Sequence, residues 1–187
     1  MRSLLPMFAL AAAVSAPVLA AETVPLPRFD SVELRGGGQI VIVPGPVQRV
    51  TLLEGSTQFT HFGLERAGQL KIDTCDERCP QFYRMRVEIE APAVPDLAIS
   101  GGGIITVEGG FRPQSQLSVA VNGGGKIDSR AVDATSVSAA VNGGGEIAVH
   151  PRSTLSAAVQ GGGNIRYSGN PQVSSAIDGG GHVGPGF

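Results

Sequence analysis

The side chains in this sequence that could do chemistry lie mainly beside a recurring glycine triplet. Three and five residues after the first glycine of several triplets stand Lys126, Asp128, Glu146, Asn164, Arg166 and His182. Carboxylates beside Lys and Arg could cleave a polysaccharide by general acid–base catalysis. The charges change sign from one triplet to the next, however, and Lys126 and Glu146 hold equivalent positions, as in an ordinary cross-strand ion pair. We therefore interpret these residues as a solvated charged face and expect no catalytic residue.

Other motifs for catalysis or ligand binding are incomplete. His61, His150 and His182 lie far apart in the sequence, with no Ser, Cys or acid at motif spacing. The glycine triplet is not followed by the Lys-Ser/Thr of a phosphate loop. It also lacks the second glycine pair and the aspartate of calcium-binding nonapeptides. We expect neither a cofactor nor a metal.

The chain has two cysteines, Cys75 and Cys79. In an oxidising compartment a pair this close is expected to form a local disulfide. Closing so short a loop stabilises the fold by only about 2 kcal/mol, so its role would be to hold one loop. The spacing differs from the Cys-x-x-Cys redox motif, and a zinc site would need two further ligands. We therefore predict a structural disulfide.

The glycine triplet itself organises the chain. Gly-Gly-Gly begins at Gly36, Gly101, Gly123, Gly143, Gly161 and Gly179, at intervals of 65, 22, 20, 18 and 18 residues. The last four triplets follow a shared segment that alternates apolar and polar residues, as in Leu117-Ser-Val-Ala-Val-Asn. A period of this length with such alternation is typical of stacked repeats. We predict an all-β protein, a parallel β-helix or β-solenoid with Gly-Gly-Gly corners and coils of 18 to 22 residues.

The alternation separates an inward from an outward set of side chains. The inward set is apolar, and four residues after each triplet begins stand Ile40, Ile105, Ile127, Ile147, Ile165 and Val183. The outward set consists of Ser118, Ala120, Asn122, Ser138, Ala140, Asn142, Ser156, Ala158, Gln160, Ser174, Ala176 and Asp178. Stacked strands would align these residues in nearly uncharged rows, whereas exposed sheets normally carry charge against association. Two interpretations stay open: the face meets a partner, or small side chains merely suit a tightly wound coil.

The domain organisation follows from composition. Residues 1–20 combine a basic start, an apolar stretch and a Val-Leu-Ala cleavage site, which predicts a signal peptide rather than a membrane span. Residues 21–96 predict less regular strands, either irregular coils or a small sandwich that caps the solenoid. Residues 97–187 hold the regular repeats, and we expect one continuous domain over 21–187. The location would be the periplasm, the outer surface or the medium.

Charge argues against two classes of partner. The formal net charge is −2, and removal of residues 1–20, which hold one basic residue, makes it −3. A chain so close to neutral has no basic patch for nucleic acid or for an anionic membrane surface.

The triplets and their flanks resemble a known family. Val32-Glu-Leu-Arg-Gly-Gly-Gly-Gln-Ile, Leu97-Ala-Ile-Ser-Gly-Gly-Gly-Ile-Ile and the Val-Asn-Gly-Gly-Gly-x-Ile series are similar to exported bacterial proteins described as putative auto-transporter adhesin, head GIN domain. The resemblance extends from about Phe29 to Val183. It implies a β-helix-like fold and an adhesin role, and it transfers no catalytic residue.

Three hypotheses follow for the function. The first is a non-catalytic, exported binding or adhesion module whose flat face meets a protein or glycan at the cell envelope, or a copy of itself. The second is a polysaccharide-active enzyme that uses Lys126, Asp128, Glu146 and Arg166. The third is a purely structural protein of the cell envelope.

Overall fold

The computed structural model describes residues 21–65, 67–75 and 79–186, and every regular element in them is a β-strand. The predicted all-β class is therefore confirmed, whereas the predicted signal peptide lies outside the described residues. The strands are β1 (Glu22–Val24), β2 (Ser31–Gly36), β3 (Gln39–Pro44), β4 (Arg49–Glu54), β5 (Thr60–Leu64), β6 (Gln69–Thr74), β7 (Arg86–Ala91), β8 (Asp96–Gly101), β9 (Ile104–Val107), β10 (Gln114–Gly123), β11 (Lys126–Gly143), β12 (Glu146–Gly161), β13 (Asn164–Tyr167), β14 (Gln172–Asp178) and β15 (His182–Pro185).

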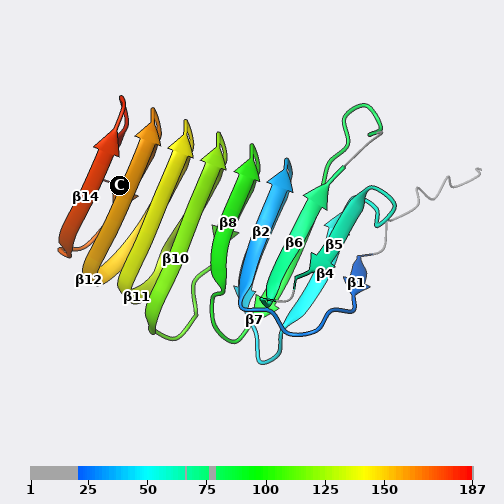
Figure 1. Ribbon diagram of the computed structural model, residues 1–187. Coiled ribbons are helices and arrows are strands. Elements are labelled where there is room, and N and C mark those ends of the chain that lie inside the picture. Colours follow the sequence, from blue (N-terminus) through cyan, green and yellow to red (C-terminus); the bar gives the residue numbers. More distant parts are fainter. Residues whose placement is uncertain (1–20, 66, 76–78, 187) are drawn as a thin grey trace, which may run out of the picture.

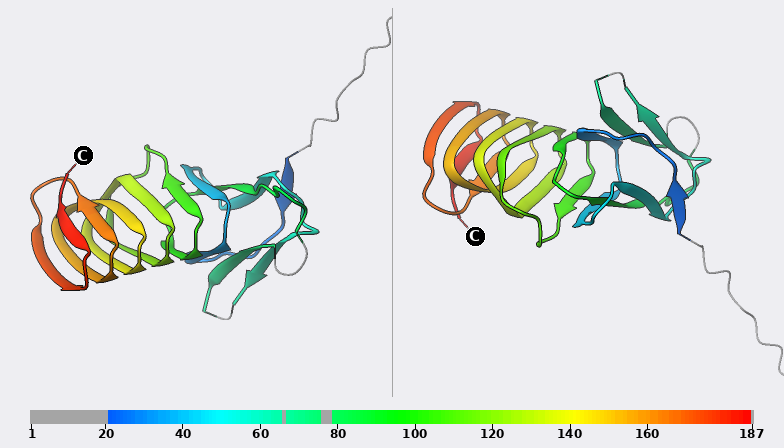
Figure 2. Two further views of the ribbon diagram at one scale, coloured as in Figure 1. Left: turned by 90° about the horizontal axis from the view of Figure 1, so that it is seen from above. Right: turned by 90° about the horizontal axis from the view of Figure 1, so that it is seen from below.

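The predicted parallel β-helix solenoid is wrong. The strands form one mixed, 15-stranded sheet that curls into a half-barrel (Figures 1 and 2). Strand β4 runs antiparallel to both β1 and β7, and β5 runs antiparallel to β6. Antiparallel pairs therefore interrupt the parallel pairing in the first half of the chain. A short turn reverses the chain between β5 and β6, where the Gly68 N–H donates to the Glu65 carbonyl at 3.0 Å.

Two long strands make the sheet continuous. Strands β11 and β12 have 18 and 16 residues, and each continues without a break from one glycine triplet to the next. The first residues of β11 pair with β9, and its last residues pair with β10. One side of the curled sheet is thus β5-β6-β2-β8-β10-β11-β12-β14, and the other passes from β9 through β11 and β12 to β13 and β15. Figure 1 shows the first of these sides.

The core lies inside the curl, and the predicted inward set forms most of it. Leu117, Val119 and Val121 are each 2% exposed, and the equivalent residues of β11 and β12 are equally buried. Among the four segments that share the repeat, burial of the inward set fails in β14, where Ile177 is 46% exposed, because no described strand lies beyond β14 to cover it. The isoleucines that follow the triplets, from Ile40 to Ile165, are completely buried.

The glycine triplets lie side by side. The first and the third glycine of a triplet are each required, for different steric reasons. The first glycine pairs in register with the first glycine of the neighbouring triplet, as Gly123 does with Gly143. Gly143 has a φ of +119°, and a Cβ there would lie 2.6 Å from the Gly123 carbonyl oxygen. A Cβ on the third glycine, Gly145, would lie 2.4 Å from Cγ1 of Val121 in the core. The middle glycine, Gly144, has nothing within 4 Å of that position.

We predict that Gly143→Ala destabilises the protein while Gly144→Ala does not. Left-handed backbone strain alone costs roughly 1–3 kcal/mol for a residue with a Cβ, and the contact with the Gly123 carbonyl adds to it. Gly144→Ala should stay within about 0.5 kcal/mol of the parent, as exposed substitutions usually do. Urea unfolding followed by circular dichroism measures both values. Equal free energies of unfolding for the two variants would contradict the steric explanation.

Candidate interaction face

The twelve outward residues predicted from the sequence lie together on one exposed side of β10, β11, β12 and β14. We call this surface the interaction face. Its residues pair in register from strand to strand and form three rows. The rows are Ser118–Ser138–Ser156–Ser174, Ala120–Ala140–Ala158–Ala176 and Asn122–Asn142–Gln160–Asp178.

The alternation of each strand creates the face. Every second side chain is buried in the core, so the residues between them must point outward. Parallel strands in register place equivalent residues about 4.8 Å apart, which turns each repeated position into a row. Asp178 is the only charged residue among the twelve.

The rows extend further than the sequence analysis proposed. Ala98 pairs with Ala120, and Ser100 pairs with Asn122, so β8 belongs to the same surface. The alternation of Leu97-Ala-Ile-Ser before its triplet could have revealed this. The face ends at β2, where the Ser100 hydroxyl donates to a Glu33 carboxylate oxygen at 2.7 Å. Arg35 lies 3.6 Å from the same carboxylate, so the neighbouring surface is charged.

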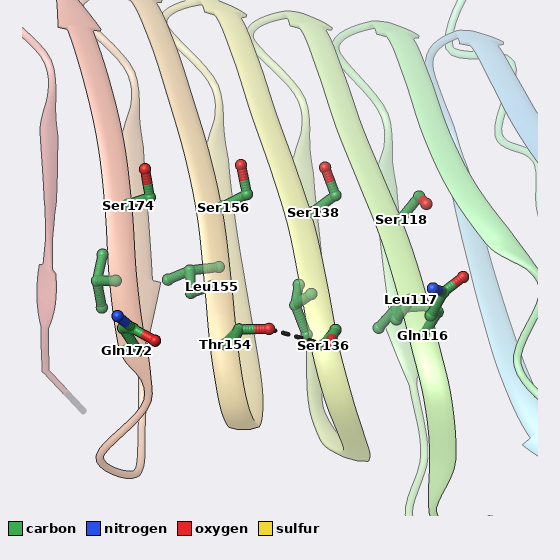
Figure 3. Close-up of a pocket in the computed structure, with 12 residues that line it drawn as sticks. Gln116, Leu117, Ser118, Ser136, Ser138, Thr154, Leu155, Ser156, Gln172 and Ser174 are labelled. Carbon is green, nitrogen blue, oxygen red and sulfur yellow. Dashed lines mark hydrogen bonds between the residues drawn. The ribbon is translucent and has the colours of Figure 1, made fainter.

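A hollow of about 450 Å³ crosses the four strands at the serine row (Figure 3). A second row, one alternation step before the serines, forms its other wall, and the sequence analysis did not include it. Its members are Gln116, Ser136, Thr154 and Gln172. The Thr154 hydroxyl donates to the Ser136 hydroxyl at 2.9 Å. Leu117 and Leu155 also line the hollow, between the two polar rows, but their side chains are almost completely buried.

A second, shallower hollow of about 240 Å³ lies over the alanine row. Ala98, Ala120, Ala140 and Ala158 line it together with Asn122 and Asn142. Methyl groups beside amides offer both apolar contact and hydrogen bonds. Such a surface can bind a partner. The Asp96 carboxylate beside the serine row accepts from the Ser118 backbone N–H at 2.9 Å, which occupies it with the main chain.

The charged residues behind the catalytic hypothesis lie on the opposite side of the curled sheet and are ion-paired. Lys126 Nζ lies 2.9 Å from a Glu146 carboxylate oxygen, as the sequence analysis expected, and Arg166 lies 3.7 Å from the other oxygen. Arg130 Nε donates to Asp128 at 2.8 Å. Asn164 and His182 pair in register on this side without completing a catalytic group.

These contacts lower the pKa of both carboxyl groups. The hydrogen bond from Arg130 lowers the pKa of Asp128, against a smaller opposing effect of burial. The hydrogen bond from Lys126 likewise lowers the pKa of Glu146, and the Arg166 charge adds to it. A general acid at neutral pH needs a raised pKa. The environment of these carboxylates therefore favours permanent ionisation and does not prepare them for acid catalysis.

The structure brings one histidine next to a serine and an acid that the sequence analysis did not connect with it. His150 Nδ1 lies 2.5 Å from the Ser168 hydroxyl, and His150 Nε2 lies 3.6 Å from an Asp133 oxygen. The second distance is too long for a hydrogen bond, which a base oriented by an acid would need. None of the hollows described above is lined by these residues. We therefore assign the group to cross-strand polar contacts.

The predicted disulfide between Cys75 and Cys79 is confirmed. It follows β6 directly, and residues 76–78 between the two cysteines lie outside the described residues. Phe82 stands nearby and is 91% exposed. The disulfide lies at the N-terminal end of the sheet, away from the interaction face.

Comparisons with known proteins give a family match over part of the chain and a shared fold. Residues 113–171 match the family model described as putative auto-transporter adhesin, head GIN domain, which confirms the resemblance over this stretch. A putative adhesin from Bacteroides fragilis has a TM-score of 0.53 at 18% identity, with 89% of this chain and 96% of that chain covered. At this identity the likeness shows a shared fold.

Other solved structures are more distant. A putative cell adhesion protein from Clostridium sporogenes has a TM-score of 0.42 at 9% identity, covering 89% of this chain and 98% of its own. A putative lipid binding protein from Parabacteroides distasonis has a TM-score of 0.40 at 16% identity, covering 90% and 96%. No curated protein matches the sequence. Within the described residues, no helix is long and apolar enough to cross a membrane.

We predict that acid weakens the fold partly through Asp128 and Glu146. Because their folded pKa values are lowered, their stabilisation is present above the ordinary carboxyl pKa, about 4, and is lost as pH falls through the lowered values. The effect should be about 1 kcal/mol or less, as for other surface ion pairs. The measurement compares urea unfolding at about pH 7 and about pH 3 for the parent and for Asp128→Asn/Glu146→Gln. The double variant should lose less stability on acidification, and equal losses would contradict the prediction.

Proposed function

We propose that the mature chain is a non-catalytic, exported binding module of the adhesion type that acts through its interaction face. The observation that carries the proposal is the face itself: twelve exposed residues in registered rows, with one charge among them. Exposed sheet surfaces usually carry charged residues that prevent association. The opposite side of the sheet follows this rule, and the interaction face does not.

The partner that fits this surface is a neutral protein or glycan of the cell envelope. Hydroxyl and amide groups can exchange hydrogen bonds with such a partner, and the alanine methyls add apolar contact. The 450 Å³ hollow is a concave place for it to lie across the strands. The family match and the fold shared with an adhesin support binding over catalysis.

We predict that Ala140→Lys and Ala158→Lys abolish binding without unfolding the protein. Both alanines are exposed, so the fold can accommodate lysine in either variant, whereas a partner would have to desolvate the new ammonium group on a neutral face. The assay measures binding of the labelled mature chain to intact cells of the source species and to purified envelope glycans.

The matched control is Ala131→Lys. Ala131 is also exposed and lies in β11, but it is outside the interaction face. This variant should bind like the parent. Unchanged binding of the Ala140 and Ala158 variants would overturn the proposed face, and loss of binding in the Ala131 variant would point to a general charge effect.

We further predict that the precursor is processed after residue 20 and exported. Protease treatment of intact cells distinguishes the two exported locations. Cleavage on intact cells would place the interaction face outside the cell, where surface glycans and host proteins are the ligands to test. Protection together with release in the periplasmic fraction would direct the search to partners inside the envelope. Retention of an unprocessed chain in the cytoplasm would overturn the prediction.

A further inference from the structure

Strand β14 is an open edge of the sheet. It has seven residues, and within the described residues it pairs only with β12. In a strand at an edge, alternate N–H and C=O groups point away from the neighbouring strand and remain available for another strand. All but one of the β14 residues are exposed.

The other described edges carry features that oppose strand addition, and β14 does not. Strand β1 has only three residues, and β15 ends in Pro185, which cannot donate a backbone hydrogen bond. Strand β5 has five residues and contains Gly63. Short length, proline and charge are the usual protections of an edge. Strand β14 contains neither proline nor lysine, and its only charge is Asp178 at its end.

The inward side of β14 is also uncovered. Ile177 is 46% exposed, whereas the equivalent Val159 of β12 is 1% exposed. Ser175 replaces the alanine that stands in the core at Ala139 and Ala157. A polar residue at this one inward position suits a strand whose inner side is in water when the chain is alone.

We propose that β14 pairs antiparallel with β14 of a second copy of this chain, about a two-fold axis at Ser175. In this register Gln172 opposes Asp178 of the second copy. Each following residue opposes the preceding residue of that copy, so all seven residues of the strand are paired. Val173 then faces Ile177 of the second copy on the inner side. Directly opposed residues in antiparallel strands share one side of the sheet, so the core alternation continues across the interface.

The charges and polar groups of β14 suit this register. Asp178 opposes Gln172 of the second copy, and the two aspartates stand about 20 Å apart, at opposite ends of the paired strands. Ser175 opposes Ser175, and their hydroxyls can hydrogen-bond across the axis. On the outer side Ser174 opposes Ala176, so the two interaction faces join into one surface on which Asp178 of each copy is the only charge among the twelve residues. The pairing does not depend on the proposed binding function.

Light scattering on size-exclusion fractions of the mature chain tests the pairing. The parent should show twice the monomer mass at high concentration and dissociate on dilution. Ser175→Lys should give a monomer, because two lysines would oppose each other at the axis. At a dilution where the parent is also monomeric, the two should unfold at the same temperature, because Ser175 is exposed in the monomer. Ser153→Lys is the control, exposed and in β12, and it should remain dimeric.

Cysteine cross-linking tests the register. Ser175→Cys should form a disulfide between copies on air oxidation with a copper catalyst, because opposed residues have Cα atoms about 4.5–5.5 Å apart. Ser174→Cys should not, since its copy stands diagonally at about 7–8 Å, beyond the disulfide range. The native Cys75–Cys79 pair is already bonded and does not compete.

Three results would overturn the proposal. The first is a parent that stays monomeric at every concentration, and the second is a Ser175→Lys variant that stays dimeric. The third is equal cross-linking of the two cysteine variants. Ala140→Lys should lose binding yet remain dimeric, so the pairing and the proposed function can fail separately. A monomeric Ala140→Lys variant would place self-association on the interaction face and would also overturn the pairing at β14.

Discussion

The structure depends on the close approach of neighbouring backbones at the glycine triplets. A Cβ at Gly143 would lie 2.6 Å from the carbonyl oxygen of Gly123, and the same contact recurs from Gly101 to Gly179. Strands that come this near can pair in only one register, because a shift by one residue would put a side chain where only glycine fits. The in-register rows of the rest of the sheet follow from this contact.

Because the strands pair in register, each repeated position becomes a row of side chains. The rows on the two sides of the curled sheet differ in charge. On the side of β13 and β15 the rows carry charges of both signs, and Lys126, Glu146 and Arg166 neutralise one another. On the interaction face the rows carry serine, alanine and amide side chains. The first side is an ordinary solvated surface, whereas the second has lost the charges that keep sheets apart. The proposed binding role rests on this difference between the two sides.

Particular residues show which parts of the fold and of the interaction face the sequence predicted. Alternation identified Leu117, Val119 and Val121 as core and the residues between them as surface, and the spacing of Cys75 and Cys79 identified their disulfide. It could not show that β4 and β5 reverse direction, because alternation is the same in parallel and antiparallel strands. Nor could it show that strands of both directions join in one curled sheet, so the predicted solenoid was wrong. Ser168 and Asp133 escaped notice beside His150 because stacking, and not sequence proximity, brings them together.

The sequence by itself determined which side chains are buried, which are exposed and which face is uncharged, because these properties depend on a local period of two residues. Tertiary structure alone decided which strands are neighbours, how the sheet curls and where it ends. Strand direction and order arise from contacts between segments far apart in the chain, such as β2 with β8 and β3 with β9. The exposure of Ile177 illustrates the division. The sequence determines its apolar character, but only its place in the edge strand β14 leaves it uncovered.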